Sequence, residues 1–307
     1  MKKPQIIVVF AGLLLISILY FLVPKSKKTD PSASSQLAAN EELSSKSIVE
    51  GAKLNLNADQ KIILLSIENQ LVKSKTESDS LKAYRNLIQY WADSAQRIEP
   101  YLYYTYSAAL LENTEKSLTF AAQLLVNNLT TPDAPPALQK WMAINAKVLL
   151  EKALVINPIN DTSKINLGAC YLFGNISDNP MEGILKVKEV VDKNPQNTYG
   201  QLILALGGKK SGQYEKAIER FLIIINLEPN NIEAMVNLAE CYELTNQKNS
   251  AIDWYTKVRE KVNIPEAKEA VTKRIKEITF YNKNYSTCLV VKKESVIKLR
   301  RTKERNV

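Results

Sequence analysis

A proline followed by polar residues interrupts the apolar runs of this chain at nearly constant intervals. The interruptions are INPIND at 156–161, KNPQN at 193–197 and LEPNN at 227–231, and their prolines stand 37 and 34 residues apart. Proline lacks the amide donor that a helix interior needs and disfavours the α conformation in the residue before it, so each proline ends a helix. The Asn or Asp residues that follow can cap the next helix. The spacing therefore predicts a helical unit of about 34 residues that recurs.

Aligning the units places the same residue types at the same positions. With 198–231 as one unit and 232 onward as the next, small residues fall at positions 8 and 20 and aromatic residues at 24; these are Ala205 and Ala239, Ala217 and Ala251, and Phe221 and Tyr255. The preceding unit, 161–197, has Leu167, Gly168 and Tyr171 at positions 7, 8 and 11, matched by Leu238, Ala239 and Tyr242, and after a three-residue insertion it has Gly183 at 20. Earlier still, Ala146 falls at 20. Small residues at 8 and 20 let two helices cross closely, while large residues fill the space beside them.

These residues resemble the tetratricopeptide repeat family over about 146–262. The resemblance rests on LGACY at 167–171, GQYEKAIERF at 212–221, NLAECY at 237–242 and AIDWY at 251–255. The chain departs from the family at position 4, where Gln201 and Met235 replace a tryptophan, and at position 11 of the middle unit, where Gly208 replaces a tyrosine. The resemblance implies an all-α fold: a right-handed α-solenoid of helical hairpins that presents a concave groove to a protein or peptide.

In this family the groove is lined by positions 2, 5, 9 and 12 of each first helix, which form one stripe. Carried onto this sequence, the stripe consists of Tyr199, Leu202, Leu206 and Lys209 in the middle repeat and Glu233, Val236, Glu240 and Glu243 in the last, with Asn237 beside Val236. This mixture indicates a partner segment with an apolar face for the three aliphatic residues and a basic end near Glu233 and Glu240. The acidic residues argue against a clamp for the C-terminal carboxylate of a chaperone. The alternative is that the protein's own N-terminal helices fill this surface.

The run from Ile6 to Val23 contains 18 uncharged, mostly apolar residues. As a helix it would be about 27 Å long at about 1.5 Å per residue, close to the thickness of the hydrocarbon core of a bilayer. The run is longer than the roughly 7–15 apolar residues of a cleaved signal peptide, which is the competing interpretation. We therefore predict a single transmembrane helix in front of the solenoid. Lysines on both sides of the run nearly cancel the positive-inside rule, and we place the body in the periplasm.

The predicted organisation has six parts. They are a membrane anchor at 1–24, a flexible linker at 25–56, an N-terminal helical region at 57–133, tetratricopeptide repeats at 134–264, a capping helix at 265–278 and a basic tail at 279–307. The linker is rich in Ser, Lys, Ala and Glu and lacks a sustained apolar period. Asn57 and Gln60 have the spacing of an N-cap pair, which predicts a helix start. Further helices are predicted near 100–112, 114–129 and 135–157.

The sequence offers little for catalysis. It contains no histidine, so general acid–base chemistry and imidazole metal ligation lose their usual side chain. No dinucleotide-binding, P-loop or nucleophile-elbow motif occurs. We interpret Cys170 and Cys241, both at position 10, as packed core thiols, because neither has a histidine partner. We also interpret YLYYTY at 101–106 as helix packing and GGKK at 207–210 as part of a repeat helix. We predict that the protein is not an enzyme and that it binds no cofactor or metal.

The net charge of +9 is concentrated at the two ends, with +4 in residues 1–30 and +6 in 281–307. The body therefore offers no broad basic surface for nucleic acid. We predict a membrane-anchored scaffold that binds a protein or peptide partner. It is similar to the membrane-tethered tetratricopeptide proteins of bacterial envelopes, which implies the bacterial inner membrane and assembly of an envelope complex. The alternatives are a helical enzyme with its active domain at 57–133, and lipid or nucleic-acid contact through the basic tail.

Overall fold

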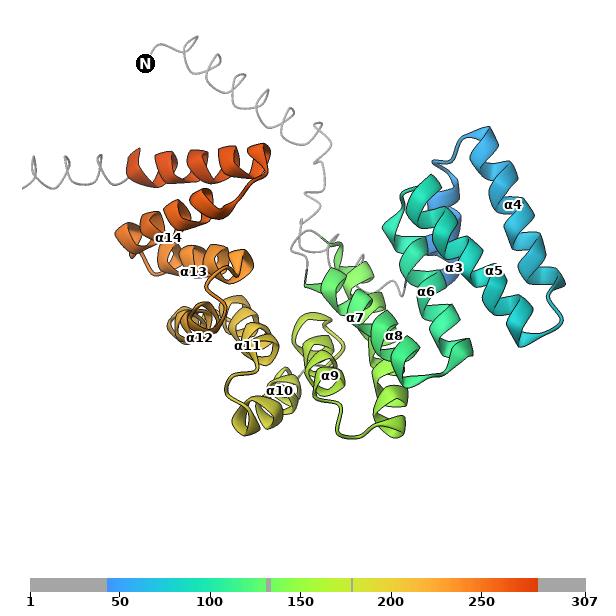
Figure 1. The fold of residues 1–307 in the computed structure, drawn as a ribbon, viewed down its shortest axis with the longest axis horizontal. Coiled ribbons are helices and arrows are strands. Elements are labelled where there is room, and N and C mark those ends of the chain that lie inside the picture. The colour runs from blue at the N-terminus through green and yellow to red at the C-terminus, as the bar shows by residue number, and fades with distance from the viewer. Residues whose placement is uncertain (1–42, 131–133, 178, 281–307) are drawn as a thin grey trace, which may run out of the picture. The chain divides into compact units, whose positions relative to one another are not determined.

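The computed structural model describes residues 43–130, 134–177 and 179–280, and all regular secondary structure within them is helical (Figure 1). The all-α class that the repeats predicted is therefore confirmed for this part of the chain. Among these residues no helix is both long enough and apolar enough to cross a membrane. The predicted anchor, most of the predicted linker and nearly all of the basic tail lie outside the described residues.

Twelve α-helices and one π-helix follow one another along the described chain. They are α3 (Ser45–Lys53), α4 (Ala58–Lys73), α5 (Glu77–Gln89), the π-helix η1 (Tyr90–Ser94), α6 (Ile98–Glu112), α7 (Glu115–Leu129), α8 (Pro136–Ile156), α9 (Asp161–Phe173), α10 (Met181–Lys193), α11 (Thr198–Lys210), α12 (Tyr214–Leu227), α13 (Ile232–Leu244) and α14 (Lys248–Lys261). Residues 265–280 are helical as well.

The proline-containing interruptions are joints between helices, as predicted. After each proline an asparagine stands at the N-cap of the next helix, and its side chain accepts a hydrogen bond from a backbone amide. The bonds are Ser163 N to Asn160 Oδ1 (2.8 Å), Gly200 N to Asn197 Oδ1 (2.8 Å) and Ala234 N to Asn231 Oδ1 (2.9 Å). Each bond satisfies an amide that the first turn of the helix leaves without a partner. The same local chemistry therefore starts α9, α11 and α13.

The helices pair into hairpins at the small residues of positions 8 and 20. A Cβ atom added to Gly168 of α9 would lie only 2.7 Å from the carbonyl oxygen of Gly183 in α10. In the next two hairpins the corresponding alanines are fully buried; they are Ala205 and Ala217, and Ala239 and Ala251. Neighbouring hairpins also contact one another through their first helices, α9 with α11 and α11 with α13. The described repeats are thus an α-solenoid of tetratricopeptide-like hairpins.

One helix lies where the sequence predicted flexible linker. The predicted linker ended at residue 56, whereas α3 begins at Ser45 and packs against α6. Ile48 and Val49 are buried there, with 7% and 6% of their surfaces exposed. The helix has only nine residues, so its apolar positions are too few to produce a detectable period in the sequence.

The helical region that follows starts as predicted. Asn57 and Gln60 form a reciprocal capping box at the start of α4. Of the apolar residues in this helix, Leu64 is buried, while Ile62 and Leu65 remain exposed because α4 packs against α5 along one side. Tyr104, in the tyrosine-rich stretch of α6, is buried with its ring 4.9 Å from that of Tyr103. The packing interpretation of that stretch is therefore confirmed.

Candidate partner-binding surface

The predicted groove residues all lie on two adjacent first helices, α11 and α13 (Figure 1). We call these nine residues the first-helix surface: Tyr199, Leu202, Leu206, Lys209, Glu233, Val236, Asn237, Glu240 and Glu243. Each keeps part of its surface accessible to solvent, and Glu233 is exposed. Their neighbours Ile203, Met235 and Leu238 are buried in the core. The helical period thus divides each first helix into a core side and an accessible side.

A hydrogen-bond network holds the Tyr199 end of this surface in place. The Tyr199 hydroxyl donates to Asn166 Oδ1 of α9 and accepts from Gln123 Nε2 of α7 at 3.1 Å. Asn166 Nδ2 in turn donates to Gln123 Oε1 at 2.7 Å. Burial raises the pKa of Tyr199 to about 12, so the phenol stays neutral at physiological pH. The repeat pattern did not indicate Gln123 or Asn166; the one available signal was a polar asparagine, Asn166, inside the apolar run of α9.

Two acidic residues of the surface are already paired with cations of the protein itself. Lys209 forms an ion pair with Glu240 and donates to Asn237 Oδ1 at 2.7 Å, which links α11 to α13. Arg274, in the helix at 265–280, pairs with Glu243 and donates through Nε at 3.1 Å. Lys209 compensates the charge of Glu240 in the unbound protein, so a basic end of a partner would have to compete with Lys209 for this carboxylate.

Among the described residues, Glu233 is the acidic residue of the surface that forms no ion pair. The described ion pairs involve Glu240 and Glu243 and leave the Glu233 carboxylate without a cation. Although this residue is exposed to solvent, partial desolvation by the surrounding protein raises its pKa. A cation brought by a partner would relieve this penalty, since an opposite charge favours the ionised carboxylate. We therefore expect a basic side chain of the partner to contact the end of the surface at Glu233.

Of the N-terminal helices of the described chain, α7 reaches one end of this surface, where Gln123 Nε2 donates to the Tyr199 hydroxyl at 3.1 Å. α3 packs on α6, and α6 packs on α7 and α8, whereas α11 and α13 pack on α9, α10, α12 and α14. Leu202 and Leu206 rest partly on the hydrophobic core beneath them, and the remainder of each side chain is accessible. Apart from this contact of α7 with Tyr199, the described packing of residues 43–130 leaves the surface open to a partner.

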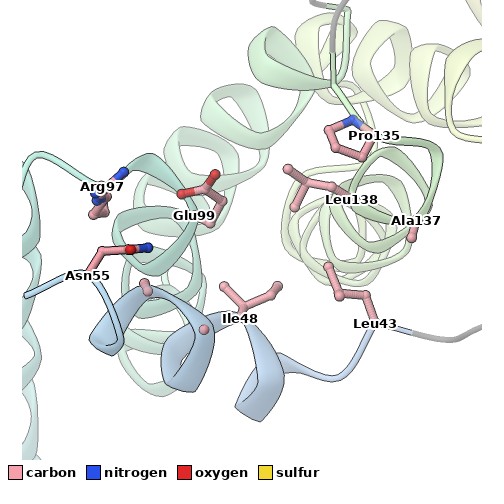
Figure 2. A pocket seen from close by; sticks show the side chains of 10 residues that line it. Leu43, Ile48, Asn55, Arg97, Glu99, Pro135, Ala137 and Leu138 are labelled. Atoms are coloured by element: carbon pink, nitrogen blue, oxygen red, sulfur yellow. The ribbon is translucent and has the colours of Figure 1, made fainter.

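A separate hollow lies between α3 and the starts of α6 and α8 (Figure 2). Its volume is about 350 Å³, and its lining includes the apolar side chains of Leu43, Ile48 and Leu138. Arg97 and Glu99 line it from the start of α6. Sequence reasoning could not find this hollow, because it treated the residues of α3 as linker.

The two repeat cysteines are core residues, as predicted. Cys170 and Cys241 are both completely buried and both carry free thiols. Burial raises the pKa of Cys170 to about 12 and that of Cys241 to about 11. Thiols with such pKa values form almost no thiolate at neutral pH, so they are poor nucleophiles. Within the described ranges no group of three or more Cys, Asp or Glu side chains is arranged to hold a metal ion.

The buried thiols predict a loss of stability at alkaline pH. In the unfolded chain a thiol ionises near pH 8.5, whereas burial keeps Cys170 and Cys241 protonated to higher pH in the folded state. The unfolded state therefore releases protons first, and the free energy of unfolding should decrease from about pH 8.5 upward. Urea denaturation at pH 8, 9 and 10 measures this decrease. A variant with Cys170→Ala and Cys241→Ala should lose less stability over the same range; an equal loss would contradict the assignment.

Comparison with known proteins adds one family match and several solved structures. No curated protein matches the sequence. The sequence model of the family described as "Regulator of microtubule dynamics protein 1-3" matches residues 202–283, which is a minority of the chain. The match begins in α11 and includes α12, α13, α14 and the helix at 265–280.

The similar solved structures share low sequence identity with this chain. One is residues 41 to the end of MamA from Desulfovibrio magneticus RS-1, with 21% identity, covering 61% of this chain and 97% of that chain at a TM-score of 0.40. Another is YrrB, described as a TPR protein with an unusual peptide-binding site, with 17% identity, covering 67% of this chain and 97% of that chain at a TM-score of 0.39. Because these identities and TM-scores are low, the α-solenoid fold is inferred from the hairpins described above.

Proposed function

We propose that the protein is a membrane-anchored scaffold that binds a segment of a protein partner on the first-helix surface. One observation carries the proposal: Leu202, Leu206 and Val236 stay partly exposed on adjacent helices, beside polar groups that are already held in place. Apolar side chains of the segment would cover these three residues. A basic side chain at one end of the segment would pair with Glu233.

The polar groups around the apolar residues favour binding because they are preorganised. Tyr199 is fixed by Gln123 and Asn166, and Asn237 is fixed by Lys209. Side chains that are ordered before binding lose little conformational entropy when the partner arrives. The Tyr199 hydroxyl and the Asn237 amide are neutral and can form hydrogen bonds with the backbone of an extended or helical segment. The surface therefore combines apolar contact with fixed hydrogen-bonding groups.

The apolar run Ile6–Val23 supports a membrane anchor. We propose that the membrane is a bacterial inner membrane and that the body lies in the periplasm. An anchored scaffold meets membrane-bound partners at a raised effective concentration, so a modest affinity suffices for assembly. This favours a role in assembling a complex of the cell envelope over the capture of a freely diffusing peptide.

Photo-crosslinking in intact membranes tests the proposal. A photoreactive amino acid at Leu202 or Val236 should capture the same protein. The same group at Leu185, which is 61% exposed on α10, should not capture it. The added substitution Glu233→Lys should reduce the yield from position 202 at least about tenfold. It should lower the melting temperature only slightly, because a cation in the first turn of α13 costs about 0.3–1 kcal/mol. Equal capture from position 185, or a yield indifferent to Glu233→Lys, would overturn the proposal.

A further inference from the structure

The tyrosine at position 11 occupies the same kind of site in two of the three repeats. Lys147 of α8 and Lys186 of α10 lie 5.3 Å and 5.8 Å from the centroid of the Tyr171 ring. In the repeat numbering these lysines stand at position 21 of the preceding second helix and position 23 of the repeat's own second helix. The ring is therefore held between two successive second helices.

The last repeat follows the same arrangement. Tyr242 packs in one hydrophobic cluster with Ile218 of α12 and Trp254 of α14. Ile218 stands at position 21 of the preceding second helix and Trp254 at position 23 of the repeat's own. The tyrosine at position 11 thus lies near positions 21 and 23 of the two second helices, through ring contacts in the first repeat and within one hydrophobic cluster in the last.

The middle repeat has a cavity at the corresponding site. Position 11 is Gly208, and a cavity of about 310 Å³ is lined by Gly208 together with Ile184 at position 21 and Arg220 at position 23. Leu172 and Leu204 add apolar lining. The space that a tyrosine ring occupies in the flanking repeats is therefore left open between α10 and α12.

Packing does not require the glycines that border this cavity. A Cβ atom at Gly208 would lie 3.5 Å from the Gln213 carbonyl oxygen and 3.6 Å from the Ala217 Cβ, which are ordinary contacts. At Gly207 the nearest atom, a methyl carbon of Leu172, would be 3.5 Å away. Glycine inside a helix costs about 0.5–1 kcal/mol relative to alanine. α11 therefore contains two glycines, Gly207 and Gly208, that destabilise the helix. Because they have no side chains, the cavity beside them stays open.

Three cations line the same cavity: Lys188, Lys216 and Arg220. Lys216 donates to Gln213 at 2.9 Å and Arg220 to Gln201 at 2.6 Å, but none of the three forms an ion pair within the described residues. Asp192 and Glu219 act on Arg220 only through weaker electrostatic attraction. This contrasts with the first-helix surface, where Lys209 is already neutralised by Glu240. The cavity therefore joins an apolar interior to an uncompensated positive rim.

We propose that this cavity binds an aromatic side chain of a protein partner that is flanked by carboxylates. The ring would take the place of the missing tyrosine, with Arg220 beside it as Lys186 lies beside Tyr171, an arrangement that a cation–π attraction favours. The flanking carboxylates would pair with Lys188 and Lys216. None of the lining residues belongs to the first-helix surface, so this is a second site, independent of the function proposed above.

Binding of short capped peptides to the full-length protein in detergent micelles tests this site. The probe is 4-fluorophenylalanine between two aspartates, followed by fluorine NMR. Wild-type protein should bind it saturably. Two comparison peptides should bind at least about tenfold more weakly: one has alanine between two aspartates, and the other has 4-fluorophenylalanine between two lysines. Because the alanine peptide carries no fluorine, its binding is measured by competition against the probe. Equal binding of all three peptides would overturn the proposal.

Two variants locate the binding. Gly208→Tyr should fill the cavity, abolish binding of the probe and leave the melting temperature equal to or higher than that of the wild type. Lys188→Glu should weaken binding at least about fivefold, whereas Lys152→Glu, an exposed residue of α8 outside the cavity lining, should not change it. Unchanged binding in Lys188→Glu, or a Gly208→Tyr protein that is less stable than wild type, would show that the cavity does not accept such a ring.

Discussion

Replacing Phe221 with alanine is expected to lower the free energy of unfolding by about 3–5 kcal/mol. Phe221 stands at position 24 on α12 and is completely buried. It shares a hydrophobic cluster with Ala205, Ile218 and Leu238, which come from three successive helices. Removing the ring leaves a cavity that these helices could close only by moving closer together, which their other contacts oppose. Urea denaturation followed by far-ultraviolet circular dichroism measures the loss.

The matched control for this prediction is Ile223→Ala on the same helix. Ile223 is 40% exposed, so its truncation removes less buried surface and should cost less than about 1.5 kcal/mol. Since repeat proteins are stabilised by interfaces between neighbouring units, the Phe221 variant should also weaken the hairpins on either side. Similar losses in the two variants would mean that α12 does not pack as described.

Replacing Gly183 with valine is expected to cost about 3 kcal/mol, because the new side chain would overpack the crossing of α9 and α10. A Cβ atom at Gly183 would lie 2.5 Å from the carbonyl oxygen of Gly168 and 2.9 Å from the Cβ of Tyr171. The nearer atom belongs to the backbone and can move away only if the two helices separate. The melting temperature and the urea midpoint should both decrease.

Gly51→Val in α3 is the control, because no atom lies within 4 Å of the Cβ position there. It also replaces glycine with valine inside a helix, yet it should leave stability nearly unchanged or slightly increased, since valine has the higher helix propensity. If Gly183→Val were as stable as Gly51→Val, the close crossing at positions 8 and 20 would not exist.

The predictions that held were those that depend on residues close together in the chain. Proline and asparagine act on the backbone within a few residues, so the order of residues alone located the joints around Pro158, Pro195 and Pro229. The capping box at Asn57 is local in the same way. The small residues at positions 8 and 20 recur in each helical unit, and this recurrence predicted that the two helices of a unit form a hairpin. The same residue period also separated the accessible side of α11 and α13 from the core side.

The tertiary structure decided which side chains meet across helices. The partners Lys209 and Asn237 are 28 residues apart, Arg274 and Glu243 are 31 apart, and Asn166 and Gln123 are 43 apart. Such pairs depend on the axial offset between helices and on the rotamer of each long side chain, which the period of one helix does not specify. For this reason the sequence placed Glu240 on the accessible side but could not show that Lys209 neutralises it. Likewise, it showed that position 208 lacks a tyrosine ring, and only the structure showed that the space stays open between α10, α11 and α12.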